Sequence, residues 1–515
     1  MGASMENDQL PVVEFLSKPE AYGEHGLTVE RVETHISEIF LIKDRAYKLK
    51  RAVRFPYLDF DTREKRRIAC EAEVTINRRT APQLYLGVKA VVRREDGKLA
   101  LDGEGEVLDW LVEMVRFDQN YLFDRLALKG SLDRRIMEEL GDVIATFHGL
   151  AEPVSKAGGL AGLAMIADNN AACFAQFGVG ILDAEKVAHL NQELKRQING
   201  LGPILDARKQ NGQVRHCHGD LHLRNICLLD GRPTLFDAIE FSRDFSDIDV
   251  LYDLAFLLMD LDHRDLRGLA NVCFNRYMDL TGEGEALGCM PIFMAVRASI
   301  RSHVALAAAQ NLSDPSGAQA LHNEAAQYLE MAIGYLESHS PRLIAVGGLS
   351  GSGKSHAARE IASLIGCAPG ARVLRSDVLR KRLMGCHPLD RLGPEGYTPD
   401  VTSKTFQTLY AEVETALKTG HSVIADAVFS NTEQRDAIAR VAEKLGVPFQ
   451  GLWLEAPLEV MVQRVTDRKA NASDAKADIV QLQTGYNLGD ISWSRIDSSG
   501  TRRETLGKLS SVLGI

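Results

Sequence analysis

The stretch Gly348-Leu-Ser-Gly-Ser-Gly-Lys-Ser355 fits the pattern G-x-x-x-x-G-K-[ST] at every fixed position. It follows a short apolar run, residues 342–346, which is typical of a buried parallel strand, and it precedes residues 356–365, which have helical spacing. Glycines in such a loop let backbone N–H groups turn inward around a phosphate, at a helix N-terminus that already favours anions. The sequence therefore predicts a phosphate-binding loop between a strand and a helix.

Each part of this loop has a predicted role in holding a nucleotide. Lys354 would reach the β- and γ-phosphates, and the Ser355 hydroxyl would ligate Mg²⁺. The other residues predicted to surround the phosphates are Gly348, Ser350, Gly351, Ser352 and Gly353. A chance loop rich in glycine and serine is the alternative, but the flanking strand and helix argue against it.

Length and composition limit the class of protein. A chain of 515 residues is too long for one hydrophobic core, so two or three domains are expected. A net charge of −10 argues against a general nucleic-acid or membrane-surface binder, although it does not exclude a local basic groove. No segment approaches the roughly 18 uninterrupted apolar residues of a membrane span. The eight cysteines include no C-x-x-C pair. We therefore expect a cytoplasmic protein.

The N-terminal part combines strands with a charged helix. Alternating apolar residues predict a hairpin of two strands over residues 38–50. Lys48 and Lys50 share one face of its second strand, because side chains repeat every second residue. Residues 62–80 predict a helix with Glu73 near its middle. Taken alone, such charges are usually solvated surface groups.

A second chemical motif lies in the middle of the chain. His218-Gly-Asp220 and Asn225 fit H-x-D-x-x-x-x-N, the spacing of a kinase catalytic loop. In that loop the aspartate accepts a hydroxyl proton from the substrate and the asparagine holds Mg²⁺. Asp237 directly follows a predicted strand, in the place of the metal-binding aspartate of D-F-G, although the Phe-Gly is absent here. The alternative is a loop of the same spacing in a catalytically inactive protein.

These residues carry a resemblance to a known family. Residues 13–338 resemble the aminoglycoside phosphotransferase/choline kinase branch of the kinase-like fold. In that branch the catalytic loop has the motif H-G-D-x-H-x-x-N, which is matched here by His218, Gly219, Asp220, His222 and Asn225. The motif D-L-A that follows in the family is matched by Asp253-Leu-Ala255. The resemblance implies a flexible N-terminus over residues 1–12, an N-lobe over 13–115 and a helical C-lobe over 116–338.

The same resemblance implies that one lysine binds the α/β-phosphates of ATP. Ala46-Tyr-Lys48 is similar to V-A-I-K of kinases, whereas Tyr47-Lys-Leu-Lys50 fits the Y-x-L-K of this branch and favours Lys50. Glu73, or Glu71, would form an ion pair with that lysine. Glu113-Met-Val115 would be the hinge between the lobes, whose backbone receives adenine. No G-x-G-x-x-G precedes Lys48, which leaves open how backbone amides cover the phosphates.

In the C-terminal part, two further strands end in aspartate. Residues 371–377 end in Asp377, and residues 421–426 end in Asp426, the position where a carboxylate holds Mg²⁺ through water. Strands alternate with helices over residues 341–515, so we expect a parallel sheet with ligand sites at the carboxyl ends of its strands. The two aspartates and the phosphate-binding loop would then share one site.

This part resembles small P-loop kinases of the polynucleotide kinase, gluconate kinase and zeta-toxin group. Their Ser-Asp-x-x-Arg is matched by Ser376, Asp377 and Arg380, which implies that Asp377 is the general base and that Arg380 orients the substrate. Arg464 and Arg468, spaced i and i+4 on a predicted helix, resemble lid arginines that neutralise charge on the transferred phosphoryl group. A helix N-cap for the aspartate and a solvated face for the arginine pair are the alternatives.

Together the two resemblances imply an α/β and α+β multidomain chain, in which a bilobal protein-kinase-like fold is followed by a P-loop NTPase parallel-sheet domain. They imply a bifunctional phosphotransferase that uses ATP and Mg²⁺ and acts on hydroxyl groups of small molecules or nucleotides. One alternative is a nucleotide-dependent regulator with one active domain and one sensor domain. Another is a kinase of RNA or DNA ends or of nucleotide sugars. The sequence does not identify the acceptors, the preference between ATP and GTP, or the oligomeric state.

Overall fold

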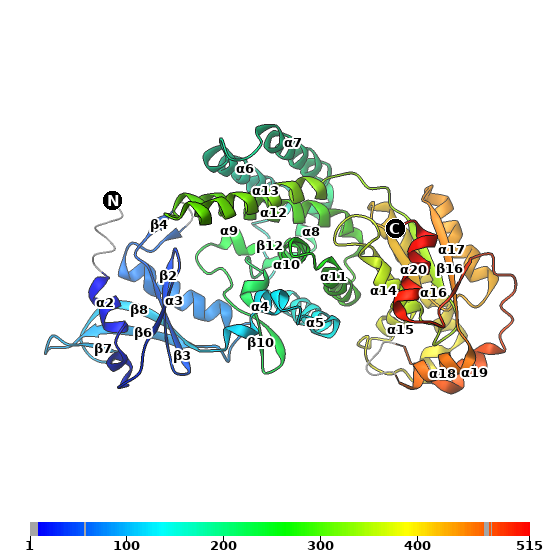
Figure 1. Cartoon of the computed structure of the whole chain (residues 1–515), viewed down its shortest axis with the longest axis horizontal. Coiled ribbons are helices and arrows are strands. Elements are labelled where there is room, and N and C mark those ends of the chain that lie inside the picture. Colours follow the sequence, from blue (N-terminus) through cyan, green and yellow to red (C-terminus); the bar gives the residue numbers. More distant parts are fainter. Residues whose placement is uncertain (1–8, 56–57, 468–472, 475) are drawn as a thin grey trace. The chain divides into compact units, whose positions relative to one another are not determined.

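The computed structural model describes residues 9–55, 58–467, 473–474 and 476–515 (Figure 1). It contains two compact units, of which the first comprises Met1–Gly162 and Leu205–Leu257, and the second comprises Leu163–Ile204 and Leu258–Ile515. The second unit thus groups helices that precede residue 340 with the C-terminal sheet. The boundary predicted at residue 341 therefore runs through a region that packs as one unit.

The first unit is built on an antiparallel sheet of six strands in the order β1-β2-β3-β8-β6-β7 (Figure 1). Their bounds are β1 Glu30–Glu33, β2 Ser37–Ile42, β3 Arg45–Lys50, β6 Tyr85–Arg93, β7 Leu99–Leu101 and β8 Glu106–Val115. The helix α3 (Arg63–Asn77) packs against β6 and β8. The hairpin and the charged helix predicted from the sequence are therefore both present.

The two faces of β3 have different partners. Tyr47 and Leu49 point into an apolar cluster that includes Val12 and Leu16 of α2 (Leu10–Leu16). Lys48 and Lys50 alternate with them and contact Glu73 of α3 on the other face. Of the N-terminal residues predicted to be flexible, 1–8 lie outside the described residues, whereas 10–12 belong to α2, and Val12 is buried in that apolar cluster.

The remainder of the first unit surrounds the predicted catalytic loop. Short strand pairs flank that loop: β9 (Val214–His216) pairs with β12 (Asp247–Asp249), and β10 (Ile226–Leu229) pairs with β11 (Arg232–Leu235). The other elements here are β4 (Arg54–Phe55), β5 (Leu58–Asp59), α4 (Phe123–Leu128), α5 (Arg134–Leu150), α8 (Gly202–Gln210), α9 (Arg243–Ser246) and the start of α10 (Val250–His263). The helix α5 packs against β11.

In the second unit, helices precede the C-terminal sheet. They are α6 (Gly159–Phe177), α7 (Ala184–Gly200), α11 (Arg267–Thr281), α12 (Met290–Gln310) and α13 (Pro315–Tyr335). The helices α12 and α13 are separated by a short break before Pro315. Asp314 accepts hydrogen bonds from the backbone N–H groups of Ser316 and Gly317, and Pro315 at the first helical position starts a new helix.

The segment Gly284–Gln310 is long and apolar enough to cross a membrane, since an 18-residue window in it has a mean hydropathy of 1.3, and 67% of that window is buried within the structure. Burial to that extent is also found in core helices of globular proteins. Within this unit α12 packs along α13 and against α7. The composition of the segment is therefore weak evidence for a membrane span.

The C-terminal sheet is parallel and has five strands in the order β14-β15-β13-β16-β17. The bounds of these strands are β13 Leu343–Gly347, β14 Arg372–Arg375, β15 Val423–Asp426, β16 Phe449–Glu455 and β17 Ser494–Asp497. The connecting helices are α14 (Lys354–Ala362), α15 (Ser376–Leu383), α16 (Pro399–Lys418), α17 (Thr432–Leu445), α18 (Leu458–Thr466), α19 (Ala477–Thr484) and α20 (Arg502–Leu513). The parallel sheet predicted from the sequence is confirmed.

The edge strand β14 is closed by α11, which comes from well before the sheet in the sequence. Asn275 Oδ1 accepts a hydrogen bond of 2.7 Å from the backbone N–H of Val373. Asn271 Nδ2 donates to the carbonyl oxygen of Ala371 at 3.1 Å. Arg372 Nη2 lies 2.7 Å from Asp279 Oδ1. Side chains of α11 therefore satisfy backbone groups that an edge strand otherwise exposes.

Two buried histidines of the second unit should make its stability depend on pH. Burial lowers the pKa of His421 and of His303 to about 4 in each case. Since the unfolded chain takes up these protons below pH 6.5 and the folded chain does not, stability should fall as the pH drops from 6.5 to 4, by up to about 3 kcal/mol per histidine. Urea titrations at several pH values, followed by tryptophan fluorescence, measure this change in the free energy of unfolding. A His421→Phe variant should show a shallower slope over this range, and an equal slope would contradict the assignment.

Candidate active sites

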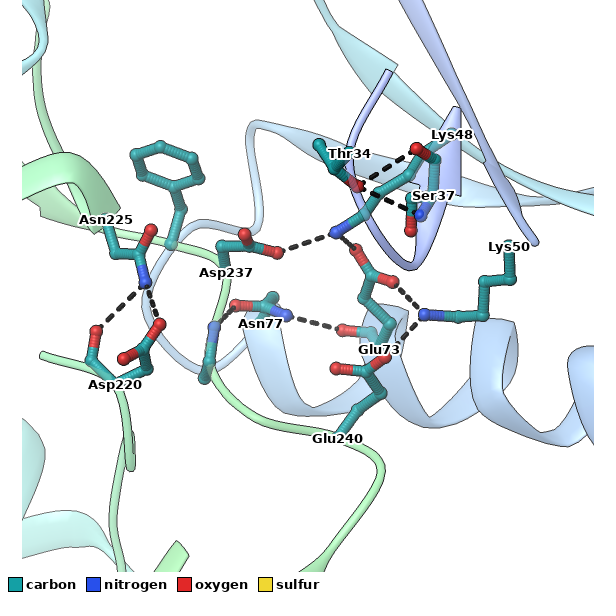
Figure 2. A network of polar contacts seen from close by, with 12 residues as sticks. Thr34, Ser37, Lys48, Lys50, Glu73, Asn77, Asp220, Asn225, Asp237 and Glu240 are labelled. Carbon is teal, nitrogen blue, oxygen red and sulfur yellow. Dashed lines mark hydrogen bonds and ion pairs between the residues drawn. The ribbon is translucent and has the colours of Figure 1, made fainter. Parts of the chain in front are cut away.

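The predicted catalytic loop presents Asp220 at a partly open site of the first unit (Figure 2). Asn225 Nδ2 donates to the backbone oxygen of Asp220 at 2.9 Å and to its Oδ2 at 2.8 Å. His222 Nε2 lies 3.3 Å from the same Oδ2. The Asp220 side chain is 37% exposed, so a substrate hydroxyl can reach it. The asparagine amide nitrogen is held by Asp220, which orients the amide oxygen away from that carboxylate.

Asp253, at the start of α10, anchors this loop through its backbone. Its Oδ2 accepts from the N–H of His218 at 3.0 Å, and its Oδ1 accepts from the N–H of Gly219 at 2.9 Å. Gly219 has φ +84°, and a Cβ there would lie 2.9 Å from the carbonyl oxygen of Phe245. The conformation of this His-Gly pair is thus explained by a buried carboxylate and by a turn that only glycine fits.

His218 does not face the substrate side but ties the loop to the strand pair beside it. Burial lowers the pKa of its imidazole, which is therefore neutral at pH 7. Its Nε2 lies 2.9 Å from the carbonyl oxygen of Phe236, so Nε2 carries the proton and donates it there. The histidine of this motif consequently has a supporting role.

Asp237 is held in an unusual backbone conformation by residues of the N-terminal sheet and of α3. It has φ +60°, a strained value for an aspartate. Its N–H donates to the Tyr85 hydroxyl at 3.1 Å, and the N–H of Ala238 donates to Asn77 Oδ1 at 2.8 Å. Neither Tyr85 nor Asn77 was identified from the sequence, since no motif marks them. Figure 2 shows the Asp237 carboxylate directed toward Lys48.

Lys48, Lys50 and Glu73 form a buried network of ion pairs (Figure 2). Lys48 Nζ lies 2.9 Å from Glu73 Oε1 and 2.7 Å from Asp237 Oδ1. Lys50 Nζ lies 2.6 Å from Glu73 Oε2 and also contacts Glu240 Oε1. Burial opposes the charge of Glu73, but the two lysines outweigh it and lower its pKa to about 2. The carboxylate is therefore ionised at pH 7.

The geometry favours Lys48 over Lys50 as the phosphate-binding lysine, contrary to the preference that the Y-x-L-K match indicated. Lys48 contacts the candidate metal ligand Asp237 and retains 13% side-chain exposure. Lys50 is 1% exposed and enclosed by two carboxylates. Glu73 is the ion-pair partner, whereas Glu71 is half-exposed and pairs with Arg67 on the surface of α3.

The predicted hinge does not fit the structure at Val115. Its backbone N–H donates to the carbonyl oxygen of Leu84 at 2.9 Å, and the N–H of Arg116 donates to that of Asp44 at 2.9 Å. The Glu113 side chain accepts a hydrogen bond from the Tyr47 hydroxyl at 3.3 Å. Strand pairing thus continues to the end of β8 and occupies the amide that was expected to receive adenine.

The turn between β1 and β2 replaces the missing glycine-rich loop. Thr34 N–H donates to the carbonyl oxygen of Ser37 at 2.8 Å, and Ser37 N–H donates to Thr34 Oγ1 at 2.9 Å. These two amides are satisfied within the turn. Cover of a nucleotide phosphate by these two amides would therefore require the turn to open.

In the second unit, the loop between β13 and α14 has the conformation expected of a phosphate-binding loop. Gly348, Gly351 and Gly353 have φ of +137°, +86° and +94°. A Cβ at Gly348 would lie 2.5 Å from the carbonyl oxygen of Leu454, and one at Gly351 would lie 2.5 Å from that of Met461. The glycines are therefore required both by backbone angle and by close approach.

Other contacts hold this loop in shape. Ser350 N–H donates to Gln483 Oε1 at 2.7 Å, and Ser498 Oγ donates to the carbonyl oxygen of Ser352 at 2.6 Å. Lys354 Nζ donates to the carbonyl oxygen of Leu349 at 3.1 Å, so the lysine folds back over the loop. The sequence carries no signal that pairs the two distant side chains, Gln483 and Ser498, with this loop.

The predicted aspartates lie at the same edge of the sheet as the loop. Asp426 ends β15 and is in register with Val346 of β13 and with Arg375 of β14. Its Oδ2 lies 3.3 Å from Arg375 Nε, and the residue is 4% exposed. Asp377 follows in the first turn of α15. Parallel strands thus bring these residues to one end, as predicted.

The predicted arginines have different surroundings. Arg380 is buried, and its Nη1 donates to the carbonyl oxygen of Gly396 at 2.7 Å and to Thr402 Oγ1 at 3.1 Å. Arg464 Nη2 donates to the carbonyl oxygen of Ser498, beside the loop, at 2.7 Å. Arg468 lies outside the described residues, so a shared helix face with Arg464 stays a prediction.

Comparison with protein families agrees with these two sites. Residues 58–286 match the family model described as the phosphotransferase enzyme family. Residues 343–486 match the model of an AAA domain. The chain carries a phosphotransferase-family domain followed by a P-loop domain. The catalytic loop and Asp237 lie in the phosphotransferase domain, and the phosphate-binding loop lies in the P-loop domain.

Several proteins are similar to this chain. Uncharacterized proteins of Mycobacterium tuberculosis and Mycobacterium bovis are 26% identical over 485 residues, which cover 92% of this chain and 93% of theirs. An adenylyl-sulfate kinase of Myxococcus xanthus is 28% identical over 117 residues, 23% of this chain and 59% of that protein. A solved choline/ethanolamine kinase family protein of Mesorhizobium loti is 13% identical, with a TM-score of 0.38, and covers 64% of this chain and 99% of its own.

The second unit contains the P-loop domain and also the last part of the phosphotransferase-family match. The match to the phosphotransferase family extends to residue 286 and so includes α11, the helix that closes the edge strand β14 of the P-loop domain. That helix contributes to the packing of β14, which is followed directly by Asp377. These contacts between α11 and β14 lie within the second unit.

Proposed function

We propose that this protein is a bifunctional phosphotransferase, which uses ATP and Mg²⁺ and transfers the γ-phosphate to hydroxyl groups of small molecules or nucleotides. The observation that carries the proposal is the presence of two separate sets of groups for phosphoryl transfer, one in each unit. One set combines Asp220 with the Lys48–Glu73 ion pair, and the other combines the glycine loop with Asp377. Positioning and charge stabilisation are what this reaction requires of a protein.

In the phosphotransferase domain, Asp220 accepts the proton of the acceptor hydroxyl. Asn225 and Asp237 are the residues that would hold Mg²⁺, since amide and carboxylate oxygens are its preferred ligands and both lie at the loop with Asp220. Bound Mg²⁺ supplies neutralisation of the charge that develops on the phosphoryl oxygens. Lys48, oriented by Glu73, binds the α/β-phosphates.

In the P-loop domain, the loop backbone and Lys354 bind the phosphates, and Asp377 accepts the proton of the second acceptor. Ser355 and Asp426 would hold Mg²⁺ there through hydroxyl and carboxylate oxygens at the carboxyl end of the sheet. Arg380 orients the acceptor, and Arg464, which lies beside the loop, stabilises the charge on the transferred group.

Measurement of nucleotide stoichiometry and turnover tests the proposal. The wild-type protein should bind two nucleotides, and Lys354→Ala and Asp377→Ala should each abolish transfer in the P-loop domain while leaving the melting temperature within a few degrees. The Lys354 ammonium and the Asp377 carboxylate act on phosphate and acceptor rather than in packing. Isothermal titration with ATP gives the number of nucleotides bound, and a screen of metabolites with labelled γ-phosphate gives the number of labelled products. A single nucleotide site with one labelled product would contradict bifunctionality.

A nucleotide-dependent regulator is the second candidate. The internally satisfied amides of the turn at Thr34 and Ser37 favour it, because a phosphotransferase domain without amide cover would bind ATP and turn it over slowly. The domain would then sense ATP and control the P-loop domain. Phosphoryl transfer by a Lys354→Ala protein, lost when Asp220→Ala is added, would rule out a sensor role for the phosphotransferase domain.

A further inference from the structure

A chain of alternating charges connects the candidate metal ligand Asp237 to the interior of the first unit. Its members in order are Asp237, Lys48, Glu73, Lys50 and Glu240, as Figure 2 shows. Exposure falls along the chain: the Asp237 side chain is 41% exposed, whereas those of Glu73 and Lys50 are 0% and 1% exposed. The outer end of this chain faces the nucleotide site, and the inner end is closed to solvent.

Bound nucleotide would compete with the outer ion pair. In the proposed function, Lys48 would bind the phosphates and Asp237 would hold Mg²⁺, so the 2.7 Å contact between them would be given up. Glu73 must then keep its place while its partner Lys48 is shared with a strongly charged ligand. Only one of the two Glu73 oxygens, Oε1, contacts Lys48.

The inner ion pairs are able to hold Glu73 during this exchange. Oε2 of Glu73 accepts from Lys50 at 2.6 Å, and Lys50 also contacts Glu240, which is 6% exposed. Glu240 lies three residues after Asp237, so the same pair attaches the segment that carries Asp237 to β3. The end of β3 is itself fixed by Gln9, which donates to the carbonyl oxygen of Lys50 at 2.9 Å.

Stability alone is a weak reason for burying these charges. Removal of two or more ions from water is costly, and replacement of a buried ion pair by apolar residues of similar volume is often neutral or stabilising. A charged pair at this place is better explained by the direction in which it holds the Glu73 carboxylate. Lys50 is too enclosed to bind a phosphate itself.

We propose that Lys50 and Glu240 are positioning residues, which hold Glu73 and the Asp237 segment in place while Lys48 exchanges Asp237 for the phosphates of ATP. This inference rests on the proposed phosphotransferase activity of the first unit. It assigns the two lysines of β3 different roles: Lys48 contacts the nucleotide, and Lys50 acts through Glu73.

The test uses the full-length protein with Lys354→Ala, so that only the first unit turns over ATP. To this parent we add Lys50→Met, or Lys50→Met together with Glu240→Leu. The single change leaves Glu240 buried without its lysine and should lower both the melting temperature and kcat. The double change removes both charges and should restore the melting temperature. It should nevertheless leave kcat for ATP hydrolysis at least about tenfold below the parent, with a smaller change in KM, because displaced catalytic groups slow the chemical step.

The matched control is Arg67→Met with Glu71→Leu, which removes an exposed ion pair of 2.6 Å from the same helix. It should leave kcat unchanged. A double variant of Lys50 and Glu240 with the kcat of the parent would overturn the inference while leaving the proposed function intact. A parent protein that neither binds ATP in the first unit nor hydrolyses it would instead refute the proposed function of that unit, and the inference with it.

If the double variant does not fold, Glu240→Gln is measured in the same background. The amide keeps the shape and an acceptor for Lys50 but removes the charge, and we expect kcat to fall by about threefold or more because the Asp237 segment is held less firmly. An unchanged kcat in a folded Glu240→Gln protein would overturn the positioning role.

Discussion

Replacement of Asp220 by asparagine in the Lys354→Ala background should lower phosphoryl transfer from ATP by about 10²- to 10⁴-fold, the usual contribution of a positioned general base. Asp220 is the proposed acceptor of the hydroxyl proton, whereas His218 is neutral and bound to the carbonyl oxygen of Phe236. Transfer of labelled γ-phosphate to a metabolite pool, or ATP hydrolysis where no acceptor is known, measures the effect.

The fold should survive this change. An amide oxygen at position 220 can still accept from Asn225 Nδ2, which now bonds Oδ2 at 2.8 Å. Asp230→Asn in the turn between β10 and β11 is a suitable control, since Asp230 has φ +50° and asparagine tolerates that conformation. The control should retain its activity. An active Asp220→Asn protein, or one whose loss of activity follows a large fall in melting temperature, would contradict the assignment.

Residues 341–515, expressed without the preceding helices, should be unfolded or aggregated. This fragment contains the whole parallel sheet but lacks α11. The N–H of Val373 and the carbonyl oxygen of Ala371 would lose their partners, and Arg372, which is 3% exposed, would lose Asp279. Loss of these contacts, each worth about 0.5–3 kcal/mol, is a large share of the typical stability of about 5–15 kcal/mol for a domain. An exposed edge strand also promotes association.

Circular dichroism and size-exclusion chromatography of two fragments measure this effect. The fragment 258–515 includes α11 and should be more soluble than the fragment 341–515. Its helix content should also be higher than the additional helices alone would give. In the full-length protein, Asn275→Ala should lower the stability of the second unit by about 1–3 kcal/mol, because the N–H of Val373 loses its acceptor. A monomeric, folded fragment 341–515 that binds ATP would show that α11 is dispensable.

The sequence predicted both sites because their chemistry depends on contiguous residues. The loop over residues 348–355 and the catalytic loop around Asp220 each place several reactive groups within a few positions, and close backbone approach requires their glycines. The parallel sheet followed from strands that alternate with helices. The family matches over residues 58–286 and 343–486 confirm both domain types.

Features that depend on residues distant in the sequence were missed or left open. Lys48 and Lys50 lie two positions apart and each fits a motif, of which the Y-x-L-K match favoured Lys50, whereas their different burial against α3 favours Lys48. The family resemblance placed the hinge at Glu113-Met-Val115, because a motif does not show which backbone amides strand pairing occupies.

By itself, then, the sequence determined the fold class of each part and the motifs of the two candidate sites, because local patterns of apolar residues and contiguous motifs encode them. Only the tertiary structure decided which lysine of β3 contacts Asp237, which residues hold Asp237, and that α11 closes the edge of the P-loop sheet. Those decisions rest on contacts between side chains and backbone groups tens to hundreds of residues apart. Such contacts depend on packing and burial in three dimensions, which no local pattern in the sequence specifies.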